Sequence, residues 1–133
     1  MTDEELARKK LAQIETCVAD LRRSADLSRL RSDLREQRFV EHTLQIAIQS
    51  AIDLASHVVS DERLGEPATN RELFALLARA GWIPMELEAP LASMVSFRNV
   101  LVHGYDEVDL DIVEDVVRDH LGDLLKLAEC MRA

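Results

Sequence analysis

The stretch RNVLVHGY, residues 98–105, brings together a guanidinium, an imidazole and the chain's only tyrosine. An imidazole exchanges protons near neutral pH, and a guanidinium binds an anion through two parallel hydrogen bonds. Arg98 and His103 are five positions apart, too far to share one face of an uninterrupted helix. Gly104 is typical of a helix end. We therefore expect the helix to end between them, so that Arg98, His103 and Tyr105 form one polar cluster.

The same three residues also have a purely structural interpretation. Arg98 and His103 can complement the negative end of a helix macrodipole and cap its free carbonyls. Tyr105 can pack its ring at the end of a bundle while its hydroxyl stays in water. The spacing alone does not choose between this interpretation and a chemical one.

The composition favours helices around this stretch. Apolar residues make up 47% of the 133 residues, aromatic residues only 4%, and the chain has four glycines and three prolines. Aliphatic residues supply most of the apolar content, which favours helix over sheet. We predict an all-α fold, an up-and-down bundle of four long helices and one short helix, in a single domain over residues 1–133.

Local signals set the expected helix boundaries. Capping boxes, a glycine, a proline and an aspartate mark most of the ends. The first expected helix covers about residues 3–24, with a capping box of Thr2 and Glu5, and the second covers about 33–60. The third covers about 70–80, with a capping box of Thr69 and Glu72, and ends at Gly81. The last two run from near Pro84 to Gly104 and over 110–131, where Asp109 is the cap and Val108 and Val113 form a hydrophobic staple.

The charge is unevenly distributed. Residues 1–40 carry nine Lys/Arg and eight Asp/Glu, whereas residues 41–133 carry seven and seventeen, and the whole chain is −9. An acidic chain binds nucleic acid poorly without a local cationic site. The arginine-rich segment 22–38 is interleaved with acids and nearly free of aromatic residues, so we predict a solvated face that can still follow a phosphate backbone beside a site.

Other features exclude several classes of protein. No charge-free run approaches the length of a membrane span, and the charged start predicts no signal peptide, so we expect a soluble cytoplasmic protein. Cys17 and Cys130 are far apart and have no neighbouring metal-ligand pattern, which predicts reduced thiols in the core. We expect no metal site and no cofactor.

The second predicted helix carries a polar residue at every fourth position. These residues are Glu41, Gln45, Gln49, Asp53 and His57. Two interpretations of this stripe are equally good. It is either a solvated face, or a set of side chains that lies at a dimer interface or supports Arg98. Asp53, which lies among apolar neighbours, is the member we expect to be buried and to give that support.

RNVLVHGY matches the R-x4-H-x-Y motif of the HepT-like toxins, a branch of the HEPN superfamily, including the polar residue after the arginine. The stretches TLQIAIQSAIDLASHVVS and MVSFRNVLVHGYDEVD resemble the two helix blocks of that family, so the resemblance covers most of residues 30–130. It implies a HEPN-like bundle and a metal-independent endoribonuclease. Such a protein acts as the toxin of a type VII-like toxin–antitoxin pair and forms a homodimer with a shared cleft.

The resemblance also implies roles for single residues. His103 would act as the base or acid on RNA, and Arg98 would stabilise the charge that builds up on the phosphate. Asn99 would orient the phosphate or the imidazole. Tyr105 would be nucleotidylated (AMPylated) by an antitoxin of the minimal nucleotidyltransferase (MNT) type. The added phosphate could then pair with Arg98 and block the groove.

Two other functions remain open at this point. The first is a non-catalytic helical module that binds a nucleotidyltransferase partner or a nucleotide, in which Arg98 holds a phosphate and no bond breaks. The second is a dimeric scaffold that docks other proteins through its acidic face. Only the charge asymmetry speaks for the scaffold.

Overall fold

The computed structural model describes residues 3–103 and 108–132, and every regular element in these two ranges is helical. The predicted all-α fold is therefore confirmed. The elements are α1 (Asp3–Ser24), the 3-10 turn η1 (Leu27–Arg29), α2 (Leu34–Asp61), α3 (Asn70–Arg79), α4 (Met85–His103), α5 (Leu110–Asp115), the π-helical turn η3 (Val116–His120) and α6 (Leu121–Met131).

Three predictions fall outside the described residues. They are the cap at Thr2, the helix end at Gly104 and the position of Tyr105. The side chain of His103 is also outside, although its backbone closes α4.

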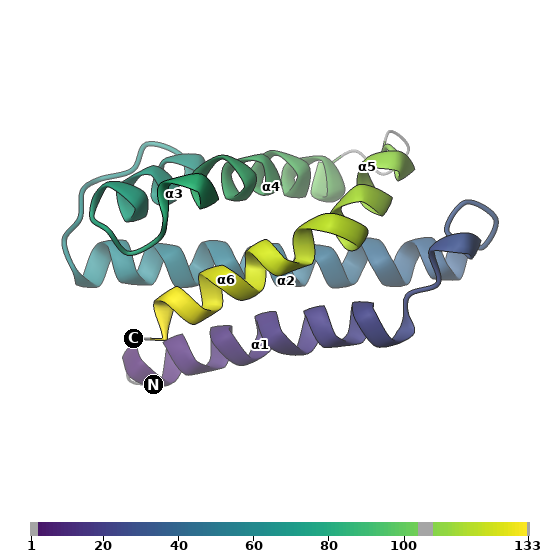
Figure 1. The fold of residues 1–133 in the computed structure, drawn as a ribbon, viewed down its shortest axis with the longest axis horizontal. Coiled ribbons are helices and arrows are strands. Elements are labelled where there is room, and N and C mark those ends of the chain that lie inside the picture. Colours follow the sequence, from purple (N-terminus) through teal and green to yellow (C-terminus); the bar gives the residue numbers. More distant parts are fainter. Residues whose placement is uncertain (1–2, 104–107, 133) are drawn as a thin grey trace.

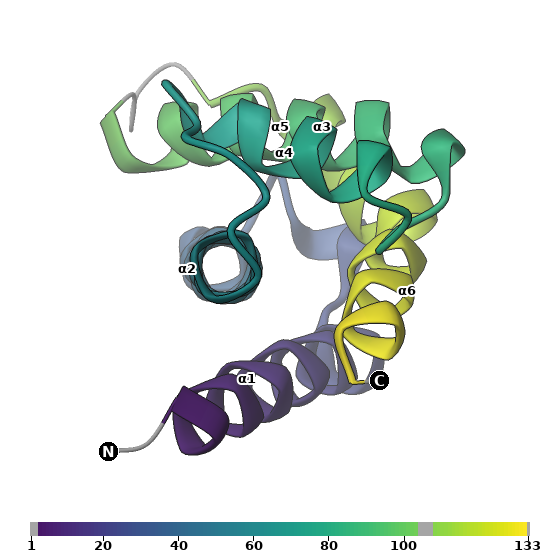
Figure 2. The same ribbon diagram turned by 90° about the vertical axis from the view of Figure 1, so that its left-hand side faces the viewer.

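The long helices run up and down around α2. α4 runs back along α2, so that α2 begins at the end of the bundle where α4 finishes (Figure 1). Viewed along its axis, α2 lies between α1 and the layer of α3 and α4, and α6 closes the side between α4 and α1 (Figure 2). The central helix predicted from its wide apolar face is therefore α2.

Short-range chemistry explains several of these boundaries. Asp33 caps α2, since its carboxylate accepts hydrogen bonds from the backbone amides of Arg35 and Glu36, at 2.9 and 3.4 Å. Gly81 has a φ of +81°, a conformation that glycine adopts freely, and it follows the end of α3. The capping box at Thr69 is wrong in one respect, because its side chain makes no cap bond. Glu72 instead accepts a hydrogen bond from the Ala68 amide at 2.7 Å.

The single helix predicted over 110–131 is wrong in the middle. The π-helical turn η3 separates α5 from α6. Val116 and Leu121 are both buried although they are five positions apart, and a regular helix brings only positions three or four apart to one face. A π turn takes in one extra residue, so it keeps both side chains on the buried side.

The core is aliphatic and continuous. Its largest fully buried side chains are Ile14, Leu21, Leu30, Leu44, Ile48, Leu54, Phe74, Leu77, Leu91, Leu121, Leu124 and Leu127. Each such side chain contributes about 1.5–3 kcal/mol by leaving water. Cys17 is buried in this core, Cys130 packs against it, and both are free thiols, as predicted. Within the described ranges, no helix is long and apolar enough to span a membrane.

Candidate active site

The end of α4 positions the residues predicted to do chemistry. Arg98 and Asn99 lie in its last two turns and His103 is its final residue. The prediction that the helix ends between Arg98 and His103 is therefore wrong, because the backbone stays helical through His103. At about 100° per residue, positions 98 and 103 are about 140° apart around the axis. The helix alone does not bring them onto one face.

Arg98 is held in place but not fully paired. Its side chain is half-buried, and its Nη1 donates a hydrogen bond of 3.1 Å to Oδ1 of the exposed Asn99. Its Nε is buried and has no hydrogen-bond partner among the described residues. A buried donor without a partner costs about 1–3 kcal/mol. Such a donor is suited to bind an acceptor that arrives with a ligand, and a phosphate oxygen is one.

Asp53 does not take the position expected of it. Its side chain keeps 36% of its surface exposed, and it forms an ion pair of 2.9 Å with Lys10 of α1. It also accepts a hydrogen bond of 2.8 Å from Gln49. The ion pair with Lys10 directs the carboxylate toward α1, so its support of Arg98 remains a hypothesis that no described contact carries.

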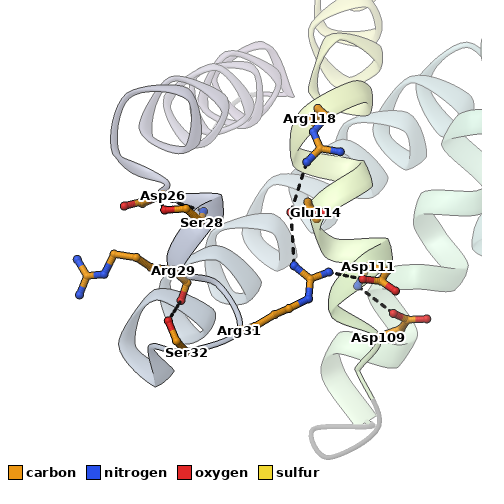
Figure 3. A network of polar contacts seen from close by, with 9 residues as sticks. All are labelled: Asp26, Ser28, Arg29, Arg31, Ser32, Asp109, Asp111, Glu114 and Arg118. Carbon is orange, nitrogen blue, oxygen red and sulfur yellow. Dashed lines mark hydrogen bonds and ion pairs between the residues drawn. The ribbon is translucent and has the colours of Figure 1, made fainter.

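An ion-pair network holds α5, the helix that follows the motif in the sequence, against the segment between η1 and α2. Arg31, between η1 and α2, pairs with Asp111 and, at 3.4 Å, with Glu114, both of α5 (Figure 3). Glu114 also pairs with Arg118 at 3.3 Å. The hydrogen bond to Asp111 raises the pKa of the Arg31 guanidinium further above its usual value. Asp109 caps α5 by accepting from the amide of Asp111 at 2.9 Å, so the segment after the motif is anchored at two points.

This network was not predicted from the sequence. The arginine-rich segment was interpreted as a solvated face, and Arg31 is indeed about half exposed, at 47% of its side chain. Its two partners lie some eighty residues downstream, and helical periodicity gives no information about such a pairing. The only signal was the pair of acids in the first turns after the motif.

Two exposed aliphatic side chains lie near the end of α4, one within the motif and one on α5. Val100 of α4 and Ile112 of α5 keep 43% and 47% of their surface exposed. A shallow pocket of about 450 Å³ lies between these helices, lined by Ser93, Ser96, Phe97, Val100, Asp109 and Ile112. Exposed aliphatic side chains that flank a pocket are typical of a contact surface.

Within the part of the chain that the structure describes, no group of three or more His, Cys, Asp or Glu side chains is arranged to hold a metal ion. The polar side chains described at the end of α4 are instead a guanidinium and an amide. Such groups can bind an anion.

A helical bundle with R-x4-H-x-Y at the end of one helix defines a protein of the HEPN class. A family profile described as "Ribonuclease HepT-like" matches residues 9–131. The chain belongs to the HepT-like family, as its motif predicted.

Relatives with known names agree with this assignment. The chain is 35% identical to the mRNA nuclease HepT of Shewanella oneidensis over 125 residues, which is 93% of this chain and 94% of that protein. It is 36% identical over 78 residues to the tRNA nuclease HepT of Aphanizomenon flos-aquae, covering 59% of this chain and 53% of that one.

A solved structure extends the similarity to the whole fold. It is the tri-AMPylated HEPN toxin of Shewanella oneidensis in complex with its MNT antitoxin. It superposes with a TM-score of 0.89 at 34% identity, covering 99% of this chain and 98% of the other. The predicted bundle architecture is thus confirmed beyond the helix content.

Proposed function

We propose that this protein is a metal-independent endoribonuclease, the toxin of a toxin–antitoxin pair whose antitoxin is an MNT-type nucleotidyltransferase. One observation carries the proposal: Arg98 lies in the last turns of α4, and its buried Nε has no hydrogen-bond partner among the described residues. The similarity to an mRNA nuclease over nearly the whole chain supports it.

The chemistry follows from the residue types. His103 takes the proton of an RNA 2′-hydroxyl, the 2′-oxygen attacks the neighbouring phosphorus, and the bond from phosphorus to the 5′-oxygen breaks. The 5′-oxygen leaves with the proton that the His103 imidazolium returns, so the products are a 2′,3′-cyclic phosphate and a 5′-hydroxyl. Arg98 stabilises the charge that gathers on the non-bridging oxygens, with Asn99 as an uncharged hydrogen-bonding neighbour.

Two copies of the chain form the working cleft in this proposal. A two-fold axis near the end of α4 brings two Arg98/His103 sets to one groove, where four cationic or titratable side chains give a local positive field on an acidic body. This removes the need for both residues to share one face of a single helix. The exposed Val100 of the motif and Ile112 of α5 supply apolar surface for the second copy.

Tyr105 is the regulatory residue of the pair. Transfer of AMP to its hydroxyl by the antitoxin places a phosphodiester and an adenosine two residues from His103. The phosphate competes with RNA for Arg98, and the adenosine fills the groove. The AMPylated state and the MNT complex of the Shewanella toxin support this step.

Expression in cells tests the proposal as a whole. Wild type and His103→Ala are induced without any partner gene, and growth and RNA integrity are followed. Wild type alone is expected to stop growth and fragment RNA, and co-expression of an MNT partner is expected to restore growth. Tyr105→Phe should resist that rescue while still cleaving RNA. Harmless expression of the wild type would refute the toxin assignment.

A further inference from the structure

A polar pocket of about 620 Å³ lies beside the end of α4 and has no role in the chemistry above. It is lined by Arg38, Phe39, Glu41, His42, Thr43, Gln45 and Leu101. All but one of these residues belong to the first half of α2, and Leu101 belongs to the motif helix. The volume lies within the range of small-ligand sites, about 300–1,000 Å³.

One face of α2 forms the polar wall of this pocket. Arg38, Glu41, His42 and Gln45 follow the spacing of a single helical face, three and four residues apart. They present a guanidinium, a carboxylate, an imidazole and an amide side by side. Arg38 is exposed, and its guanidinium interacts electrostatically with the nearby Glu41, so both side chains face the space that a ligand would enter.

The floor of the pocket is apolar and includes one aromatic ring. Phe39 is half-buried and packs against the core, and Leu101 keeps only 2% of its surface exposed. The Thr43 hydroxyl donates to the Phe39 carbonyl at 2.6 Å, so its proton is already in use. A flat ring beside hydrogen-bonding groups suits a flat ligand with a polar edge.

We propose that this pocket binds an unpaired nucleobase of RNA next to the phosphate held by Arg98, an inference that rests on the proposed ribonuclease function. Leu101 is three residues beyond Arg98, on an adjoining part of the same helix face and about 4.5 Å along the axis. A nucleotide with its phosphate at Arg98 can therefore extend its base over Leu101 and against α2.

The pocket has the groups by which proteins bind single-stranded RNA. Bases stack on aromatic rings or on arginine guanidinium planes, and their edges are read by hydrogen bonds. Phe39 and Arg38 provide the stacking surfaces. Gln45 both donates and accepts, and the ionised Glu41 only accepts.

Glu41 gives the pocket a preference among bases. The two oxygens of an ionised carboxylate can accept side by side from the N1–H and the exocyclic amino group of guanine, whereas adenine and cytosine offer one amino group and uracil only its N3–H. Burial raises the pKa of Glu41 while the nearby Arg38 lowers it. Burial of a carboxylate that a base can satisfy with two donors favours guanine in this position.

Nucleotide binding to the intact protein tests the pocket without any cleavage. NMR titrations compare GMP and UMP with ribose 5-phosphate, which has the phosphate and sugar but no base. GMP is expected to bind about tenfold more tightly than either of the other two. Gln45→Leu and Phe39→Leu are each expected to remove most of the advantage over ribose 5-phosphate, and Glu41→Gln the advantage over UMP.

Gln37→Leu is the matched control, since Gln37 lies on the same helix but does not line the pocket. It is expected to behave as wild type. Equal binding of all three ligands to the wild type overturns the proposal, as does an equal effect of the control and the pocket variants. Circular dichroism confirms that each variant is folded.

Cleavage of a randomised single-stranded RNA separates this inference from the proposed function. Sequencing of the cut ends is expected to show guanine enriched about tenfold over uracil at one position beside the scissile bond, and Glu41→Gln is expected to remove this enrichment. Cleavage without any base preference overturns the pocket and leaves the ribonuclease intact. Absence of cleavage refutes the ribonuclease, and the nucleotide titrations then decide the pocket. If the pocket variants weaken only binding of the antitoxin and leave nucleotide binding unchanged, the pocket is a contact surface for the antitoxin and the nucleobase proposal is overturned.

Discussion

Replacing Arg98 by methionine removes a buried nitrogen that has no hydrogen-bond partner among the described residues. Methionine keeps an unbranched stem of similar length, so the packing of the half-buried side chain is largely preserved. We expect the variant to be more stable than the wild type and to be inactive. The active site is thus expected to reduce the stability of the fold.

The size of the gain follows from two opposing contributions. Removal of the unpaired donor is worth about 1–3 kcal/mol, whereas loss of the bond from Arg98 to the exposed Asn99 costs about 0.5–1.5 kcal/mol. The net gain is about 1 kcal/mol. For a domain of this size, that raises the melting temperature by about 3–5 °C.

Thermal unfolding at one fixed protein concentration measures this change, because any self-association makes the melting temperature depend on concentration. Arg71→Met is the control. Arg71 is exposed and donates to the Ser96 hydroxyl, so its loss removes a bond that is already made and gives no gain. A lower melting temperature for Arg98→Met than for wild type would refute the argument that the buried nitrogen is unpaired in the free protein.

Three further changes have defined outcomes. Burial raises the pKa of Glu41, so the folded state holds this proton to higher pH than the unfolded state does. Stability therefore falls as pH rises from the unfolded-state pKa to the folded-state pKa. Glu41→Gln should raise the melting temperature at pH 7 but not at pH 4. Arg31→Met should slow RNA cleavage while it changes the melting temperature little, because exposed ion pairs add little stability. Arg31→Lys should restore part of the cleavage. Burial, then Asp20, raise the pKa of the Cys17 thiol, so iodoacetamide should label Cys17 more slowly than Cys130; equal rates would contradict its burial.

The parts of the fold predicted correctly depend on local chemistry. The ends of α1, α2 and α3 lie within a residue or two of their predicted positions, because an aspartate cap at Asp33 and a glycine at Gly81 act on the backbone next to them. The π turn was missed, although the five-residue interval from Val116 to Leu121 was visible in the sequence. The pattern was interpreted with the helical period alone.

The candidate site was predicted in its residue types but not in its surroundings. The motif identified the family, yet the helix continues through His103 and does not end between Arg98 and His103, as the spacing had suggested. Asp53 was recognised as an unusual polar residue, but its partner Lys10 lies on another helix, and a sequence pattern does not give pairings between helices. The pocket between α2 and Leu101 was missed for the same reason.

Cleavage by the purified protein in EDTA tests the central assignment most directly. Labelled single-stranded RNA is incubated with wild type, Arg98→Ala and His103→Ala, and the ends of the products are analysed. Wild type is expected to cut and to leave 2′,3′-cyclic phosphate and 5′-hydroxyl ends, while each variant is at least about 100-fold slower at unchanged helical content. Equal cleavage by the variants, or activity that EDTA abolishes and Mg²⁺ restores, would contradict the account.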